Sequence, residues 1–165
     1  MDNIAAGTIV AWIKPAKLQN DNGIFTKNGG SAGPTFFQHT TSGNLRLDIP
    51  RATTNLVVQA NSNELAANQW SFVAARWDVN GVDGDQQLYW GNLTTILAEV
   101  GGYAFQQVGS GAQADDSANN AVWGNMRSGG VGWGRYDGDI AIGILFDRKL
   151  SLSELKVLQF KILPL

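Results

Sequence analysis

The tripeptide Asp-Gly-Asp occurs twice in the chain, at residues 83–85 and at residues 137–139. Paired carboxylates of this kind can bind a hard cation such as calcium, or can divide acid and base roles in catalysis. The same tripeptide is also common in tight turns, because Asp hydrogen-bonds to its own backbone and Gly accepts a positive φ. Each copy precedes a stretch that is predicted to be a strand, so the surrounding elements decide between a site and a turn.

Other residues suited to catalysis are few and scattered. The chain contains three glutamates, Glu64, Glu99 and Glu154, and a single histidine, His39. A glycosidase needs two carboxylates at a fixed separation, and each glutamate here stands alone. The sequence contains no Gly-x-Ser-x-Gly motif, and a lone histidine on a strand is more often structural than catalytic. We therefore expect a non-enzyme in which His39 has no functional role.

Aromatic side chains are the remaining candidates for a binding site. The chain has six Trp and three Tyr, and rings flanked by Asn or Arg can stack on sugars and bind their hydroxyls. Packing in the core and contact between subunits are the alternatives for every one of these rings. The candidates beside Gly-rich turns are Trp90 with Asn92, Trp123 with Asn125, and the cluster Trp133, Arg135 and Tyr136.

The composition limits the partners. With 165 residues, the chain is predicted to form a single domain over residues 1–165. The low charged fraction of 16% and the net charge of -2 provide no basic field for nucleic acid or for an anionic membrane. The absence of cysteine excludes disulfides and thiolate metal sites. Met1 is followed by Asp2 rather than by a basic and then apolar stretch, so we expect no signal peptide in this form.

Short apolar runs separated by Gly-rich clusters predict an all-β domain of antiparallel strands. In NLRLDIP, the two-residue period places Arg46 and Asp48 on a solvated face. In DIAIGILFD, the same period predicts a strand in the middle of a sheet, covered on both sides. One core between the two sheets is predicted to contain Leu45, Leu47, Ile49, Ile140, Ile142, Ile144 and Phe146 together with Trp12.

The C-terminal segment predicts one short helix. Ser151 and Glu154 have the spacing of a capping box. The residues Leu152, Leu155, Leu158 and Ile162 would form one apolar face. A single face cannot bury every apolar residue of the tail, so we expect the sandwich or a neighbouring subunit to cover part of it. The candidates for assembly are Leu158, Phe160, Ile162, Leu163 and Leu165.

Four stretches in order resemble the laminin-G-like jelly rolls of the concanavalin A-like lectin/glucanase superfamily. They are GTIVAWIKP (7–15), WSFVAARWD (70–78), QQLYWGN (86–92) and YDGDIAIGILFDRKLSLSEL (136–155). The resemblance implies an antiparallel β-sandwich with one C-terminal helix and assigns Trp12 and Trp70 to packing. The family usually has a further strand before the first of these stretches, so its absence predicts an open sheet edge that a protein partner, a second copy or another segment would cover.

The resemblance also bears on the two tripeptides and on function. It places both in loops that enter strands, which favours turns. It also implies that any calcium would be held by Asp83, Asp85, Asp137 or Asp139, although we expect no cofactor. The function that we expect is presentation of a surface, as in a bacteriophage capsid or tail accessory (decoration) protein on a virion or an extracellular surface. The alternative is a carbohydrate-binding module of a secreted polysaccharide-degrading enzyme or of an adhesin.

Overall fold

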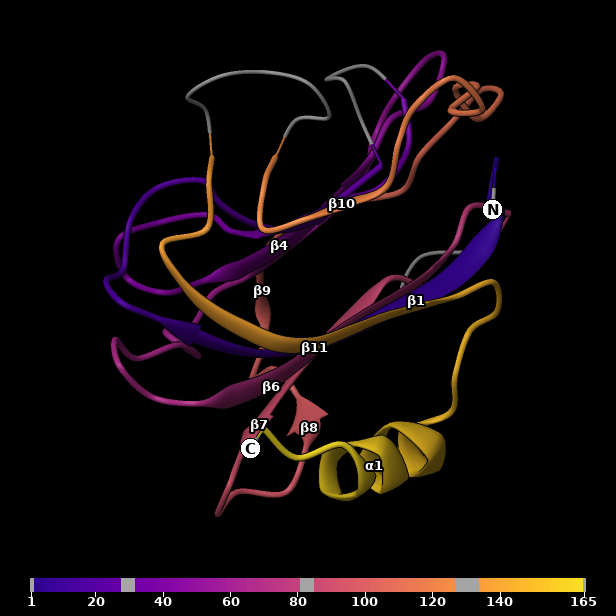
Figure 1. The fold of residues 1–165 in the computed structure, drawn as a ribbon. Coiled ribbons are helices and arrows are strands. Elements are labelled where there is room, and N and C mark those ends of the chain that lie inside the picture. Colours follow the sequence, from indigo (N-terminus) through magenta and orange to yellow (C-terminus); the bar gives the residue numbers. More distant parts are fainter. Residues whose placement is uncertain (1, 28–31, 81–84, 127–133, 165) are drawn as a thin grey trace.

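The computed structural model describes residues 2–27, 32–80, 85–126 and 134–164. Two antiparallel sheets face each other, and one helix lies against the outer face of the lower sheet (Figure 1). The five-stranded sheet has the order β11 (Gly138–Phe146), β1 (Ala6–Pro15), β6 (Ser71–Asp78), β7 (Gln87–Asn92), β8 (Ala98–Glu99). The six-stranded sheet has the order β10 (Val122–Trp123), β2 (Asn22–Thr26), β3 (Thr35–Gln38), β4 (Leu45–Ile49), β5 (Leu56–Ala60), β9 (Tyr103–Gln107). The predicted fold, a β-sandwich with one C-terminal helix, is confirmed.

Two separate apolar clusters stabilise the sandwich. The inter-sheet core contains Leu45, Leu47 and Ile49 of β4, as the sequence predicts, packed with side chains of the opposite sheet such as Ile9 and Trp77. The second group, the outer cluster, lies between the five-stranded sheet and helix α1 (Leu152–Lys161). Its buried members are Val10, Trp12, Phe72, Ala74, Tyr89, Leu97, Leu150 and Leu155.

A β-bulge in β11 turns Ile142, Ile144 and Phe146 away from the inter-sheet core, where the sequence predicts a single core. Trp12 pairs with Ile142, whereas the next residue, Ile13, pairs with Ile140, so Ala141 is an extra residue in the ladder. One extra residue reverses the face to which every later side chain points. Ile140 therefore packs against the inter-sheet core, whereas Ile142 pairs with Trp12 on the outer side.

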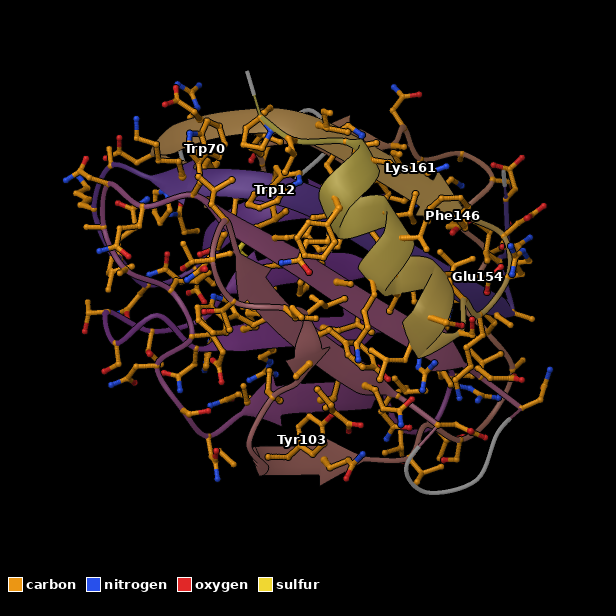
Figure 2. The ribbon with its side chains drawn as sticks, turned by 90° about the horizontal axis from the view of Figure 1, so that it is seen from below. Trp12, Trp70, Tyr103, Phe146, Glu154 and Lys161 are labelled. Carbon is orange, nitrogen blue, oxygen red and sulfur yellow. The ribbon has the colours of Figure 1, made fainter. Side chains whose placement is uncertain are left out.

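The predicted membership of the core is therefore wrong for Ile142, Ile144 and Phe146. It is also wrong for Trp12, because Ala11 and Ile13 of β1 point into the inter-sheet core and Trp12 between them points outward. Trp12, Ile144 and Phe146 belong to the outer cluster, between the sheet and α1. Figure 2 shows Trp12 and Phe146 close to the helix on this face of the sheet. The prediction that this last strand lies in the middle of a sheet is also wrong, because β11 is an edge strand and β1 lies between it and β6.

Helix α1 begins with the predicted capping box. Ser151 accepts a hydrogen bond from the Glu154 backbone, and the Glu154 side chain accepts one from the Ser151 N–H at 2.8 Å. The Arg148 guanidinium donates to the same carboxylate at 2.7 Å. The hydrogen bond from Arg148 has the largest effect and the bonds from Ser151 the next largest, and together they lower the pKa of Glu154 to about 2. The described residues include no helix that is long and apolar enough to span a membrane.

Candidate functional site

The outer faces of the two sheets differ in their cover. Helix α1 lies on the outer face of the five-stranded sheet (Figure 1). Outward-facing side chains of β4, β5 and β9 line an open groove on the six-stranded sheet. We call this hollow the β4–β5–β9 groove; its volume is about 680 Å³. Its lining residues are Arg46, Thr53, Thr54, Asn55, Val57, Gln59, Phe105 and Gln107.

The strand register sets the floor of this groove. Across the sheet, Phe37 pairs with Arg46, Arg46 with Gln59, and Gln59 with Phe105. Since side chains of directly paired residues project from the same face, these four form one row. In β4 the intervening residues Leu45 and Leu47 point into the inter-sheet core, so the row faces outward.

A second row runs beside the first one on the same face. It joins Thr35, Asp48, Val57 and Gln107. Val57 and Gln107 line the groove next to the first row. The two rows therefore place amide groups from two strands, together with one guanidinium, around a hollow that is open to solvent.

Arg46 is held in a fixed orientation by its neighbours. Its Nε donates to Asp48 Oδ1 at 2.7 Å, and a terminal nitrogen donates to Gln59 Oε1 at 3.4 Å. The guanidinium carbon lies 5.8 Å from the centroid of the Phe37 ring, which allows a cation–π contact. A planar guanidinium that is fixed in this way can donate two parallel hydrogen bonds to a ligand at little further entropic cost.

Phe105 supplies an apolar surface at the same place. Its side chain is 46% exposed, although large aromatic side chains are usually more deeply buried. An exposed ring beside fixed polar groups is suited to a ligand with one apolar face and several hydroxyls. Binding is therefore the chemistry that this groove supports.

The sequence-predicted pair Trp90 and Asn92 lines a different hollow, of about 450 Å³. It lies between β7, β8 and residues 62–69. The Trp90 ring packs against the inter-sheet core, and its Nε1 donates to Ser71 Oγ at 3.3 Å. The side-chain oxygen of Asn92 accepts from the backbone N–H groups of Thr94 and Thr95 at 2.9 and 2.7 Å. Both side chains thus have structural partners.

Of the other predicted binding residues, Trp123 and Tyr136 lie at β10 or beside it, at the opposite edge of the six-stranded sheet from the groove. Trp123 packs on Phe25 with ring centroids 4.8 Å apart, and both rings contact the inter-sheet core. The Tyr136 N–H donates to the Gly124 carbonyl at 3.0 Å. Burial of the Tyr136 hydroxyl raises its pKa.

Three members of the predicted set remain. Arg135 is exposed, and its carbonyl accepts from Gln19 Nε2 at 3.1 Å. Asn125 follows Trp123 by two residues, and Trp133 lies outside the described residues. The predicted rim residues that the structure describes are therefore distributed between two regions and do not form one site.

The second Asp-Gly-Asp tripeptide forms the turn into β11. The Asp137 carbonyl accepts from the Ala16 N–H at 2.8 Å, and Gly138 has a φ of 145°. A Cβ atom on Gly138 would lie 2.2 Å from the Lys14 carbonyl oxygen, so glycine is required there. The Asp137 carboxylate lies 3.0 Å from Lys17 Nζ, and the Asp139 carboxylate lies 3.7 Å from Lys14 Nζ.

The first tripeptide is described only in part. Asp83 lies outside the described residues, and Asp85 pairs with Lys149 at 2.7 Å. Within the described ranges, no three His, Cys, Asp or Glu side chains cluster so as to hold a metal ion. His39 contacts Asp21 at 3.3 Å and stacks edge-on with Phe37 at 5.7 Å.

Gln59, Phe105 and Gln107 were not predicted from the sequence as members of a site. The signal available in the sequence was the solvated face of NLRLDIP, which identified Arg46 correctly as outward-facing. Nothing local shows that β5 pairs with β9, which lies more than forty residues later in the chain. Without that pairing, Phe105 cannot be placed beside Gln59.

Comparisons with known proteins agree with this architecture. A laminin G family model, described as the concanavalin A-like lectin/glucanases superfamily, matches residues 2–156. Among solved structures, CBM40 of the Ruminococcus gnavus IT-sialidase is similar to this chain with a TM-score of 0.62. The identity is 18%, and the match covers 94% of this chain and 83% of CBM40.

Two further solved structures are similar. The same CBM40 bound to α2,3-sialyllactose has a TM-score of 0.61 at 18% identity, with coverage of 93% of this chain and 82% of CBM40. The native heptameric SAP-like pentraxin from Limulus polyphemus has a TM-score of 0.58 at 18% identity, with coverage of 93% and 69% respectively. A search of curated proteins finds no match. On the family match, this chain belongs to the concanavalin A-like lectin/glucanases superfamily.

Proposed function

We propose that this chain is a non-catalytic carbohydrate-binding module and that the β4–β5–β9 groove holds the glycan. The observation that carries the proposal is the exposed Phe105 ring in the same groove as Arg46, whose side chain is oriented by Asp48 and Gln59. An exposed aromatic ring and a fixed guanidinium together match the two surfaces of a sugar, which are its C–H face and its hydroxyls.

The dimensions and side chains of the groove suit an oligosaccharide. Its volume of about 680 Å³ lies within the ~300–1,000 Å³ that is typical of small-ligand sites. Gln59 and Gln107 carry both donors and acceptors, so they can bind hydroxyl groups in either hydrogen-bonding role.

The arrangement of acidic residues supports binding without catalysis. The described residues that line the groove include no Asp, Glu or His. Glu64 and Glu99 line the hollow beside Trp90, and Glu154 belongs to the capping box of α1. Glycoside hydrolysis uses two carboxylates on either side of the scissile bond, and the groove offers none.

The structural neighbours favour this reading over a role on a particle surface. CBM40 of the R. gnavus sialidase was solved with α2,3-sialyllactose bound. A glycan ligand on a sandwich of the same fold makes carbohydrate the first class to test here. The expected role as a virion or decoration protein remains a prediction.

The decisive experiment compares glycan binding by the native protein and by groove variants. A panel of neutral and sialylated oligosaccharides and purified polysaccharides would be screened, and each hit measured by isothermal titration calorimetry. Phe105→Ala should weaken binding about fivefold or more, because truncating a central aromatic contact typically costs above about 1 kcal/mol. Arg46→Lys should also weaken binding, because lysine keeps the charge but lacks the planar fork.

Phe160→Ala is the matched control for Phe105→Ala. It removes the same side chain at a similar exposure of 52%, but from helix α1 on the other side of the sandwich. Its glycan affinity should equal that of the native protein. Gln69→Ala tests the hollow beside Trp90, which Gln69 lines. Binding that is lost in Gln69→Ala but kept in Phe105→Ala would move the site to that hollow, and no binding to any glycan at millimolar concentration would refute the proposal.

A further inference from the structure

The outer face of the six-stranded sheet is covered on one side of the β4–β5–β9 groove and open on the other. On β3, the outward-facing side chains of Phe37 and Thr35 are only 3% and 7% exposed. On β9, Phe105 is 46% exposed, and its neighbours Ala104 and Gln106 are exposed as well. Since β9 is the last strand of this sheet, the face is covered at β3 and open at the β9 edge.

Part of the cover is a backbone segment that lies directly on β2. Gly23 of β2 pairs with Phe37, so it extends the first row of the groove floor by one strand. A Cβ atom on Gly23 would lie 2.5 Å from the carbonyl carbon of Asn125 and 2.6 Å from the backbone nitrogen of Met126. A gap that is too small for one side-chain carbon has no room for a ligand. The first row is therefore blocked at its β2 end.

Arg46 lies where the covered part of this row meets the open part. Its guanidinium carbon is 5.8 Å from the centroid of the buried Phe37 ring. Its Nε donates to Asp48 and one terminal nitrogen donates to Gln59, whereas the other terminal nitrogen has no hydrogen-bond partner among the described residues. That nitrogen is a donor for a ligand at the blocked end of the groove.

The loop between β4 and β5 closes the groove at one end of these strands. Thr53 and Thr54 line the groove there. Their N–H groups donate to the Ser110 carbonyl, each at 3.2 Å, and the Ser110 N–H donates to the Thr54 carbonyl at 2.9 Å. A second segment of the chain thus holds the loop in place. Across the strands, a long molecule in the groove is blocked at β2 and passes the last strand of the sheet at β9.

The spacing of the strands matches a short row of sugars. Neighbouring strands of a sheet lie ~4.8 Å apart, so Arg46 on β4 and Phe105 on β9 are separated by roughly 10 Å across β5. A pyranose ring is about as long as one strand spacing, and the three strands therefore have room for about three sugars. The first sugar would lie beside Arg46 and the third on the Phe105 ring.

We propose that the groove binds the end of a glycan chain, with the terminal sugar beside Arg46 and the rest of the chain leaving over the β9 edge. This inference rests on the proposed function, because it assigns a direction to the glycan in the same groove. A terminal sugar has a neighbour on one side only, so it fits where the row is blocked. It also carries one hydroxyl more than an internal sugar, and the free nitrogen of Arg46 can donate to that hydroxyl.

Chain length distinguishes binding of an end from binding of an internal segment. The probes are cello-, xylo-, manno- and malto-oligosaccharides of about three and six sugars, with α2,3-sialyllactose as a further trisaccharide. A groove open at both ends could bind a hexasaccharide in about four registers, so its Kd per chain would be about fourfold lower than that of the trisaccharide. A groove that binds one end has a single register. We expect calorimetry to give equal Kd values within a factor of about 1.5 and one protein bound per chain.

Two variants test the path of the chain. Phe105→Ala should weaken the trisaccharide and the hexasaccharide alike, about fivefold or more, because both place their third sugar on this ring. The exposed Asn61 follows β5 at the end away from the loop that Thr53 belongs to, and it does not line the groove. Asn61→Trp would obstruct a glycan that leaves along β5 at that end, so we expect it to leave both affinities unchanged. Circular dichroism of both variants should match the native spectrum.

The inference and the proposed function fail in different ways. Binding that depends on Phe105 but is about fourfold tighter for the hexasaccharide would overturn the inference alone, as would two proteins bound to one hexasaccharide. A selective loss of hexasaccharide binding in Asn61→Trp would also overturn it, because the chain would then leave along β5. If no probe binds, or if Phe105→Ala binds every probe as tightly as the native protein does, the proposed function and the inference fail together.

Discussion

Replacing Gln159 with leucine should destabilise the whole domain, although Gln159 belongs to a surface helix. Its side chain is fully buried and makes three hydrogen bonds to the backbone of the turn between β7 and β8. Its Oε1 accepts from the Leu97 N–H, and its Nε2 donates to the carbonyls of Asn92 and Thr95, each at 2.8 Å. These bonds hold α1 against the sheet.

The loss of unfolding free energy follows from the three backbone groups that would lose a hydrogen bond to Gln159. The buried Leu97 N–H would lose its partner, which costs about 1–3 kcal/mol. The Asn92 carbonyl is partly buried, and loss of its hydrogen bond from Gln159 would cost about 1 kcal/mol. The Thr95 carbonyl also accepts from the Asn92 N–H at 3.0 Å, so its loss is smaller. Leucine is similar in size to glutamine, so the substitution leaves little empty space. The total loss of unfolding free energy is therefore about 3 kcal/mol.

Urea unfolding measures this loss directly. The midpoint should fall at an unchanged slope, and the melting temperature should drop by about 6–12 °C for a domain of this size. The control is Gln69→Leu, because the exposed Gln69 should change stability by less than about 0.5 kcal/mol. Gln159→Glu should cost at least as much as leucine at neutral pH, because a carboxylate would face the Asn92 and Thr95 carbonyls.

A loss below about 1 kcal/mol in Gln159→Leu would refute this reasoning. It would show that water satisfies the Leu97 N–H and that helix α1 is held mainly by its apolar contacts. Amide hydrogen exchange at Leu97 gives an independent measurement. Its protection should decrease in Gln159→Leu more than the protection of β1 or β6, since the turn is the part that loses its anchor.

Three further predictions concern other parts of the domain. Lys27→Met should cost about 3–5 kcal/mol in a chemical-unfolding experiment, because it leaves the buried Asp116 carboxylate without the ammonium that lies 2.7 Å away; a loss under about 1 kcal/mol would contradict a buried ion pair. The pKa of Glu154 falls from its usual 4.5 to about 2 in the folded state, so its contribution to stability should be complete above pH 4.5 and should disappear as the pH falls toward 2; melting temperatures of Glu154→Gln should lack this dependence, and a parallel decline in both proteins would exclude Glu154 as the cause. Leu47→Ala should cost about 2–5 kcal/mol and Ile142→Ala about 1 kcal/mol or less, because Leu47 is fully buried in the inter-sheet core and Ile142 is partly exposed beyond the bulge; equal losses would place Ile142 in that core.

The sequence by itself determined the features that depend on neighbouring residues. The alternation in NLRLDIP identified which side chains of β4 point inward, because the strand period is strictly two. Ser151 and Glu154 identified the start of α1, because a capping box is a contact across three residues. The turn at Asp137-Gly138-Asp139 was predictable for the same reason, since Gly138 adopts a backbone conformation that favours glycine.

The tertiary structure alone decided the features that depend on pairing between distant strands. The extra residue Ala141 moved Ile144 and Phe146 out of the inter-sheet core, and a bulge of this kind leaves no mark in an apolar run. The groove exists because β5 pairs with β9 and brings Phe105 beside Gln59, which are 46 residues apart in the chain. Local propensities cannot encode such a contact, because it arises only when the loops close and each sheet chooses its strand order.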